Sequence, residues 1–194
     1  MTIRVGTRLH RIHARRFQAE EFNPGMGSSR FAPFASAGSQ VPTMYAGTTF
    51  ACAAYETIFH DIDPAATFKS VSMVEVEQRA VSCIEVDRDL KLARLFEPDL
   101  NRWGLTRKDL IDTPRSLYPQ TSLWAAAIHD SDPTLDGMIW TSRRFDEEKC
   151  IILFGARLDP DSISVQSSEH FATSPGSLAA LREAGQLAGI TITI

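Results

Sequence analysis

The chain has 194 residues, of which 43% are hydrophobic and 23% are charged, and its formal net charge is −4. A chain of this length and composition is expected to form one domain, residues 1–194, around a hydrophobic core, and its apolar runs are too short to span a membrane. The acidic balance, without a basic stripe interleaved with aromatic residues, argues against direct nucleic-acid binding.

The N-terminal part of the chain is basic and lacks the apolar segment of a signal peptide, so we expect a cytoplasmic protein. Residues 8–13, RLHRIH, predict a short strand. Residues 14–42 hold much of the glycine, serine, proline and alanine of this region and predict an ordered but irregular loop. Long loops inside compact domains often carry function, so this loop is a candidate part of a site.

Residues 43–47, TMYAG, predict a second strand, and a hydroxyl of Thr48 or Thr49 is expected to cap a helix that runs to about residue 61. Small residues one turn before Glu56 leave room for a ligand beside its carboxylate. Alternatively, Glu56 is a solvated residue that pairs with His60 four residues later. The apolar stripe that would turn this helix toward the core is Ala51, Ala54, Tyr55, Ile58 and Ile62.

The middle of the chain alternates apolar and polar residues. Residues 71–86 predict two strands joined by a polar turn at residues 77–80. Residues 87–115 predict a mixed connector with helical turns near residues 90–96 and 107–111.

The last part of the chain mixes helices and strands without a regular βαβ rhythm, which favours an α+β fold over a doubly wound sheet. Its predicted elements are a helix at 120–129, a strand at 136–142, an exposed turn at 143–149, a buried strand at 150–156, an amphipathic helix at 175–188 and a strand at 190–194.

Two groups of motifs are missing. The three cysteines, Cys52, Cys83 and Cys150, form no CxxC or Cys/His cluster, so we expect small buried side chains rather than a metal site or disulfides. The sequence also lacks the GxGxxG and GxxxxGK[ST] phosphate loops and the HExxH and GxSxG hydrolase motifs. The fragment GMGSS at residues 25–29 lacks the third glycine and a strand-to-helix context, so it does not predict a nucleotide loop.

Five polar residues lie in segments that otherwise look buried. Charged side chains rarely enter apolar surroundings without a partner or a ligand. Two arginines, an aromatic hydroxyl and one carboxylate predict a pocket for a phosphate-bearing sugar. The five residues are Arg11, Arg30, Tyr45, Glu56 and Ser142.

The order and context of these residues resemble the RES domain, a family named for its Arg, Glu and Ser. The resemblance spans at least residues 8–156 and rests on RLHRIH, SSRFAPF, VPTMYAG, AAYETIFH and MIWTS. It implies a fold similar to ADP-ribosyltransferases and the toxin role of a bacterial toxin–antitoxin pair. It also implies cleavage of the nicotinamide–ribose bond of NAD, by phosphorolysis to ADP-ribose-1″-phosphate and nicotinamide or by hydrolysis.

The resemblance suggests a division of roles that suits these residue types. Glu56 would face the oxocarbenium-like cation that forms on the ribose. Arg11 and Arg30 would hold the diphosphate or an incoming inorganic phosphate. Tyr45 would pack on nicotinamide or ribose, and Ser142 would bind a phosphate or ribose oxygen. NAD is then the substrate, inorganic phosphate a candidate co-substrate, and no metal is needed.

Each of these roles has a structural alternative. Either arginine could pair with a carboxylate across a strand, Tyr45 could be a core aromatic, and Ser142 could cap the turn that follows it. The residues that we expect to be structural or solvated rather than functional are His60, Trp140, Arg143 and Arg144.

The resemblance further implies a protein partner. Antitoxins of this family resemble Xre-type DNA-binding proteins, and one of them would cover the NAD pocket. The expected assemblies are a homodimer or a hetero-oligomer with that antitoxin, with no membrane involved. Two other functions stay open, namely a protein ADP-ribosyltransferase and a non-catalytic nucleotide-binding domain.

Overall fold

The fold is built on one large curled sheet. The computed structural model describes all 194 residues, and its eight-stranded sheet has the order β1-β8-β9-β10-β5-β2-β7-β11. Neighbouring strands are antiparallel except for β8 and β9, which are parallel. The strands are β1 (Thr2–Ile3), β2 (Arg8–Ala14), β5 (Thr43–Gly47), β7 (Arg79–Val86), β8 (Leu90–Arg94), β9 (Gly137–Thr141), β10 (Lys149–Phe154) and β11 (Ile163–His170).

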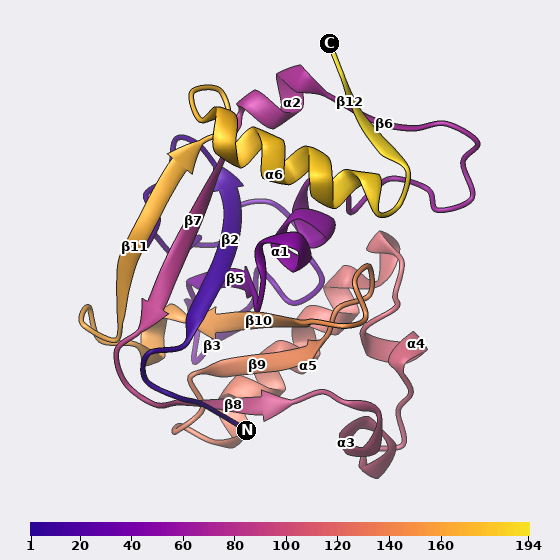
Figure 1. Cartoon of the computed structure of the whole chain (residues 1–194). Coiled ribbons are helices and arrows are strands. Elements are labelled where there is room, and N and C mark those ends of the chain that lie inside the picture. Colours follow the sequence, from indigo (N-terminus) through magenta and orange to yellow (C-terminus); the bar gives the residue numbers. More distant parts are fainter.

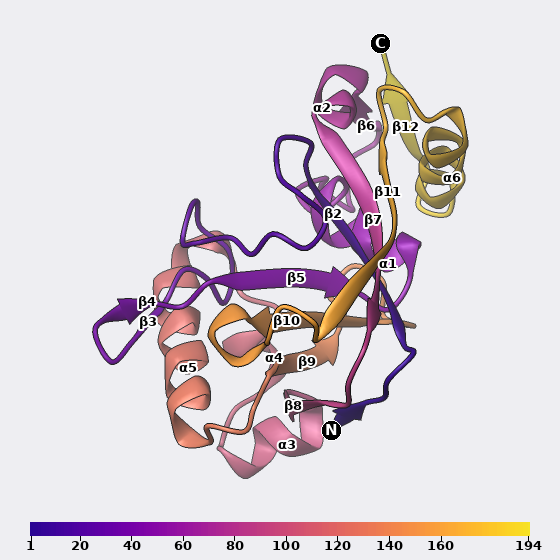
Figure 2. The same ribbon diagram turned by 90° about the vertical axis from the view of Figure 1, so that its left-hand side faces the viewer.

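The helices form two groups on this sheet. An apolar cluster packs α3, α4 and α5 against β9 and β10, and a second packs α1 and α6 against β2 and β7. Figures 1 and 2 show these groups in the lower and upper parts of the molecule. The helices are α1 (Phe50–Thr57), α2 (Met73–Glu77), α3 (Glu97–Arg102), α4 (Arg107–Leu110), α5 (Tyr118–Ser131) and α6 (Pro175–Gln186).

Two small sheets and a third apolar cluster complete the fold. β12 (Ile190–Thr193) pairs in parallel with β6 (Lys69–Ser72), and β3 (Ala35–Ser36) forms a hairpin with β4 (Ser39–Gln40) inside the long loop. The third cluster takes side chains from all eight strands of the large sheet, so it lies inside the curl. The resulting α+β fold, a mixed sheet flanked by helices, confirms the predicted class. None of the helices has the length and hydrophobicity that a membrane-spanning segment requires.

The large sheet separates between β2 and β5. These strands share a single residue pair, His10 with Gly47, whereas β5 and β10 pair along five residues. Figure 1 shows β2, β7 and β11 running steeply while β8, β9 and β10 run across the view. Gly47 also lets α1 approach, since a Cβ atom there would lie 2.9 Å from the Ala53 nitrogen and 3.1 Å from Cys52 Sγ. Helix α1 therefore begins directly against the point where the sheet divides.

Most of the predicted elements are confirmed, and the errors have local causes. Residues 73–77 form α2 instead of continuing a strand, because the Ser72 side chain accepts a hydrogen bond from the Val74 nitrogen and caps a helix. Val74 is 68% exposed, so the alternation there does not mark a buried strand face. Residues 90–94 form β8 rather than helical turns, with Leu90 and Leu92 buried on one face. Strand β11 was not predicted, because its residues are mostly polar and exposed.

A buried histidine in β2 gives the fold a predictable pH dependence. His13 Nε2 lies 2.8 Å from Ser82 Oγ, and burial lowers the pKa of His13 from 6.5 to about 4. The unfolded chain therefore binds the proton more readily, and stability is full above about pH 6.5 and falls toward pH 4. We expect this group alone to cost on the order of 2 kcal/mol over that range. Urea unfolding at pH 7 and pH 5 should show a smaller loss in His13→Gln than in the wild type, and equal losses would contradict this assignment.

Candidate functional site

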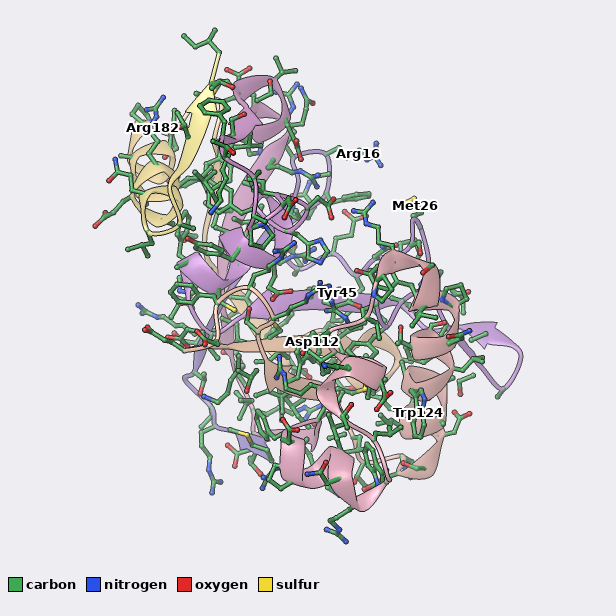
Figure 3. All side chains as sticks on the ribbon, turned by 90° about the vertical axis from the view of Figure 1, so that its right-hand side faces the viewer. Arg16, Met26, Tyr45, Asp112, Trp124 and Arg182 are labelled. Carbon is green, nitrogen blue, oxygen red and sulfur yellow. The ribbon has the colours of Figure 1, made fainter.

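A cavity of about 380 Å³ opens where β2 and β5 separate. Its walls come from β2, the loop before β5, β5 itself, α1 and the start of α5. Figure 3 shows Tyr45 at this level, between the upper and lower parts of the molecule. Four of the five predicted site residues line the cavity, namely Arg11, Arg30, Tyr45 and Glu56. The fifth, Ser142, lies behind Glu56 and contacts it.

Glu56 is held firmly through one of its two carboxylate oxygens. Thr49 caps α1 by accepting a hydrogen bond from the Cys52 nitrogen, and Glu56 follows in the last turn. Its Oε1 accepts hydrogen bonds from Ser142 Oγ at 2.5 Å and from the backbone nitrogens of Arg143 and Arg144 at 2.9 and 3.2 Å. No protein group donates to Oε2, so this oxygen is left for a ligand.

Ser142 supports the carboxylate and also caps a turn. It is 1% exposed at the end of β9. Its hydroxyl donates to Glu56 and accepts from the nitrogens of Arg144 and Phe145 at 3.1 and 2.9 Å. Ser142 therefore caps the turn that follows it, as the structural alternative required, and also binds Glu56. With one proton and two lone pairs used by the protein, Ser142 acts through Glu56 rather than through direct contact with a ligand.

Arg30 is a buried cation without a counter-charge. It is 4% exposed, no carboxylate lies within salt-bridge distance of it, and its Nε and Nη2 have no hydrogen-bond partner. Its guanidinium carbon lies 5.8 Å from the centre of the Tyr118 ring. Thr121 Oγ1 donates to the Arg30 carbonyl and so fixes the loop on α5. A buried charge of this kind is costly unless an anion pairs with it.

Arg11 binds backbone carbonyls of the long loop through one guanidinium nitrogen and also lines the cavity. Its Nη1 donates to the carbonyls of Ala19 and Glu21 at 2.7 and 2.9 Å, while its Nε has no partner. Burial lowers the pKa of Arg11 to about 10, so the group stays charged at neutral pH. Neither Arg11 nor Arg30 forms the cross-strand ion pair that the structural alternative required. Arg11 thus shapes the long loop and adds positive charge to the cavity wall.

Tyr45 braces the loop that carries Arg30. Its hydroxyl accepts hydrogen bonds from Ser29 Oγ at 3.1 Å and from the Phe31 nitrogen at 2.9 Å. Ser29 Oγ also lies 3.0 Å from the Ala32 carbonyl, and because serine has only one proton to donate, Ser29 Oγ can in turn accept the Tyr45 proton. Burial raises the pKa of Tyr45 to about 12, so the hydroxyl stays protonated. The ring meets Trp140 edge-on, with centroids 6.2 Å apart, which gives this part of the cavity an aromatic wall.

Several residues near the site differ from expectation. His60 lines the cavity, but its Nδ1 lies 2.7 Å from Asp61 rather than pairing with Glu56. Arg143 and Arg144 were expected to be solvated turn charges, yet their backbone groups hold Glu56. A serine at the end of a predicted strand, followed by a turn, was the available sequence signal for these contacts. Tyr118 was missed entirely, because it looks like an ordinary first-turn residue of α5.

The cavity floor contains two of the three cysteines. Cys52 of α1 and Cys150 of β10 are buried, with sulfur atoms 3.8 Å apart, and the contact with Cys52, together with burial, holds the pKa of Cys150 well above its usual range. Cys83 is only half-buried on β7. Small thiols rather than bulky groups therefore lie beside the carboxylate, which leaves the space above Glu56 open.

The divided sheet forms an α+β protein whose cavity is lined by two buried arginines and a braced carboxylate. The family model for the RES domain matches residues 8–174, and the chain belongs to the RES domain family. Among solved structures, the chain is similar to a chain of the M. tuberculosis MbcT–MbcA toxin–antitoxin complex. That match has a TM-score of 0.66 and 17% sequence identity, and it covers 94% of this chain and 92% of the other. A comparison with curated proteins gives no match.

Proposed function

We propose that the chain is the toxin of a toxin–antitoxin pair and cleaves the nicotinamide–ribose bond of NAD. The observation that carries this proposal is a carboxylate braced through one oxygen in the same cavity as a buried arginine without a counter-charge. This arrangement suits a substrate that has both a diphosphate and a centre that becomes positive during reaction. Membership of the RES domain family and the similarity to a chain of a toxin–antitoxin complex support the proposal.

In this mechanism the arginines position the substrate and Glu56 stabilises the reacting centre. Arg30 and the free part of Arg11 bind the diphosphate oxygens. The bond between the ribose carbon and the nicotinamide nitrogen breaks, and its electron pair leaves with nicotinamide. The positive charge that develops on the ribose faces Glu56 Oε2, so the carboxylate stabilises the transition state more than the substrate. Inorganic phosphate then bonds to the ribose carbon through an anionic oxygen, or water bonds to it and releases a proton to solvent.

The partner in this proposal is an antitoxin. The similar solved structure is described as a toxin–antitoxin complex. We propose a cognate antitoxin of the Xre type that covers the cavity and thereby blocks substrate entry. The toxin would act in the cytoplasm, where its substrate is abundant.

The decisive experiment is incubation of the purified chain with NAD, with and without inorganic phosphate, and measurement of released nicotinamide. We expect release in at least one condition, and release that requires phosphate would identify phosphate as the acceptor. No release under either condition would contradict the enzymatic function and favour a non-catalytic nucleotide-binding domain. Transfer of ADP-ribose to an added protein, seen as a mass increase, would instead identify a protein ADP-ribosyltransferase.

A further inference from the structure

Arg144 connects the catalytic carboxylate to the chain beyond α1. It lies in the turn between β9 and β10, and its backbone nitrogen donates to Glu56 Oε1 and to Ser142 Oγ. Its side chain reaches the other way, and Nη2 donates to the His60 carbonyl at 2.5 Å. One residue therefore holds both the head of Glu56 and the backbone four residues later.

The contact with His60 lies in the turn directly after α1, next to the end of the helix that has no side-chain cap. The helix has only eight residues and no basic residue in its last turn. Short helices are marginal in isolation, and their last carbonyls lack partners within the helix. Thr49 fixes the N-terminal end through its side chain, while the Arg144 guanidinium donates to the His60 carbonyl in the turn that follows the helix, three residues after Thr57. Glu56 lies in the last turn of α1, four residues before His60, so the anchored His60 backbone limits how far this end of the helix can move.

Arg144 does not itself reach the ligand space. It is absent from the cavity walls, whereas Glu56 and His60 both line the cavity. The Arg144 Nε is enclosed and has no hydrogen-bond partner, so the side chain is held mainly through its single bond to His60. Its effect on a reaction in the cavity must therefore pass through α1.

We infer that Arg144 is a positioning residue that fixes the turn directly after α1 at His60, and so the C-terminal end of α1 and the direction of Glu56 Oε2. This inference rests on the proposed function. An arginine that acts in this way changes the rate of the chemical step rather than substrate binding, because displacement of a catalytic group by about 1 Å can cost up to about 100-fold.

The test compares Arg144→Ala with a matched arginine elsewhere. Arg157 donates to the carbonyl and Nε2 of His129 in the last turn of α5 and to the Pro133 carbonyl just beyond it, outside the cavity, so Arg157→Ala removes an arginine that supports the end of another helix. We expect Arg144→Ala to lower kcat roughly 10- to 100-fold with an almost unchanged KM for NAD, and Arg157→Ala to retain the wild-type kcat. Arg144→Lys, which can still donate one hydrogen bond to His60, should recover part of the rate.

Other outcomes would overturn the inference. Equal kcat values for Arg144→Ala and Arg157→Ala would remove Arg144 from this role, and a raised KM with unchanged kcat would place it in substrate binding. Amide hydrogen exchange of residues 53–58 gives a measurement that does not need activity. We expect faster exchange there in Arg144→Ala than in Arg157→Ala, and unchanged exchange would show that Arg144 does not fix α1. A wild-type protein that releases no nicotinamide overturns the proposed function instead.

Discussion

Changing Glu56 to glutamine is expected to slow nicotinamide release by roughly 10²- to 10³-fold, with NAD affinity nearly unchanged. The amide oxygen of glutamine can still accept the hydrogen bonds from Ser142 and from the backbone of the turn that holds Oε1. The substitution therefore keeps the geometry and removes only the negative charge that, in the proposed mechanism, stabilises the developing cation. The measurements are kcat from released nicotinamide and NAD affinity from calorimetry with the slow variant.

A matched control separates this effect from a general change in charge. Glu85 on β7 pairs with Arg8 at the surface at 3.2 Å and lies outside the cavity, so Glu85→Gln removes the same charge elsewhere. It should retain the wild-type rate. If Glu56→Gln turned over NAD as fast as Glu85→Gln, Glu56 would have no catalytic role.

Replacing Arg30 with methionine should weaken NAD binding by roughly 100-fold, because a diphosphate loses a desolvated, charge-assisted partner. The same change should raise the melting temperature of the ligand-free protein, since it removes a buried charge that no acidic group compensates. The affinity for NAD should therefore fall while the stability of the ligand-free protein rises. Arg30→Lys should restore affinity only in part, because an ammonium lacks the planar pair of donors.

Calorimetry with NAD and thermal unfolding without ligand test both halves of this prediction. Arg182 on α6 provides the control, since it is exposed and points away from the molecule (Figure 3), so Arg182→Met should change neither quantity appreciably. If the ligand-free Arg30→Met protein were clearly less stable than the wild type, the role of Arg30 would be to stabilise the fold rather than to bind an anion.

The side chains of the site were predictable, whereas the contacts that position them were not. Arg30 and Glu56 are conspicuous because each interrupts an apolar segment, and the structure places both on one cavity. The backbone donors of Arg143 and Arg144 leave no trace in a side-chain pattern, because any residue except proline supplies the same nitrogen. Only the fold brings this turn against α1.

The same distinction applies to the fold. The central strand β10 is buried along nearly its whole length, and its apolar run predicts it well. Strand β11 lies at the edge of the sheet, where most of its residues are exposed and polar, so it carries no hydrophobic signal. Pairing with β7 decides its conformation, and that pairing joins residues about eighty positions apart in the chain.

Because α1 packs closely against Gly47, this position tolerates few substitutions. Every missense change at this codon adds a Cβ atom that would collide with the backbone of Ala53 and with Cys52, and α1 would have to move. Such a change displaces Glu56 although Gly47 has no side chain of its own in the cavity wall. At Gly176 no heavy atom lies within 4 Å of an added Cβ, so that codon is open to substitution. Gly47 offers no side chain to a reaction, but its position must remain a glycine if α1 is to keep its place.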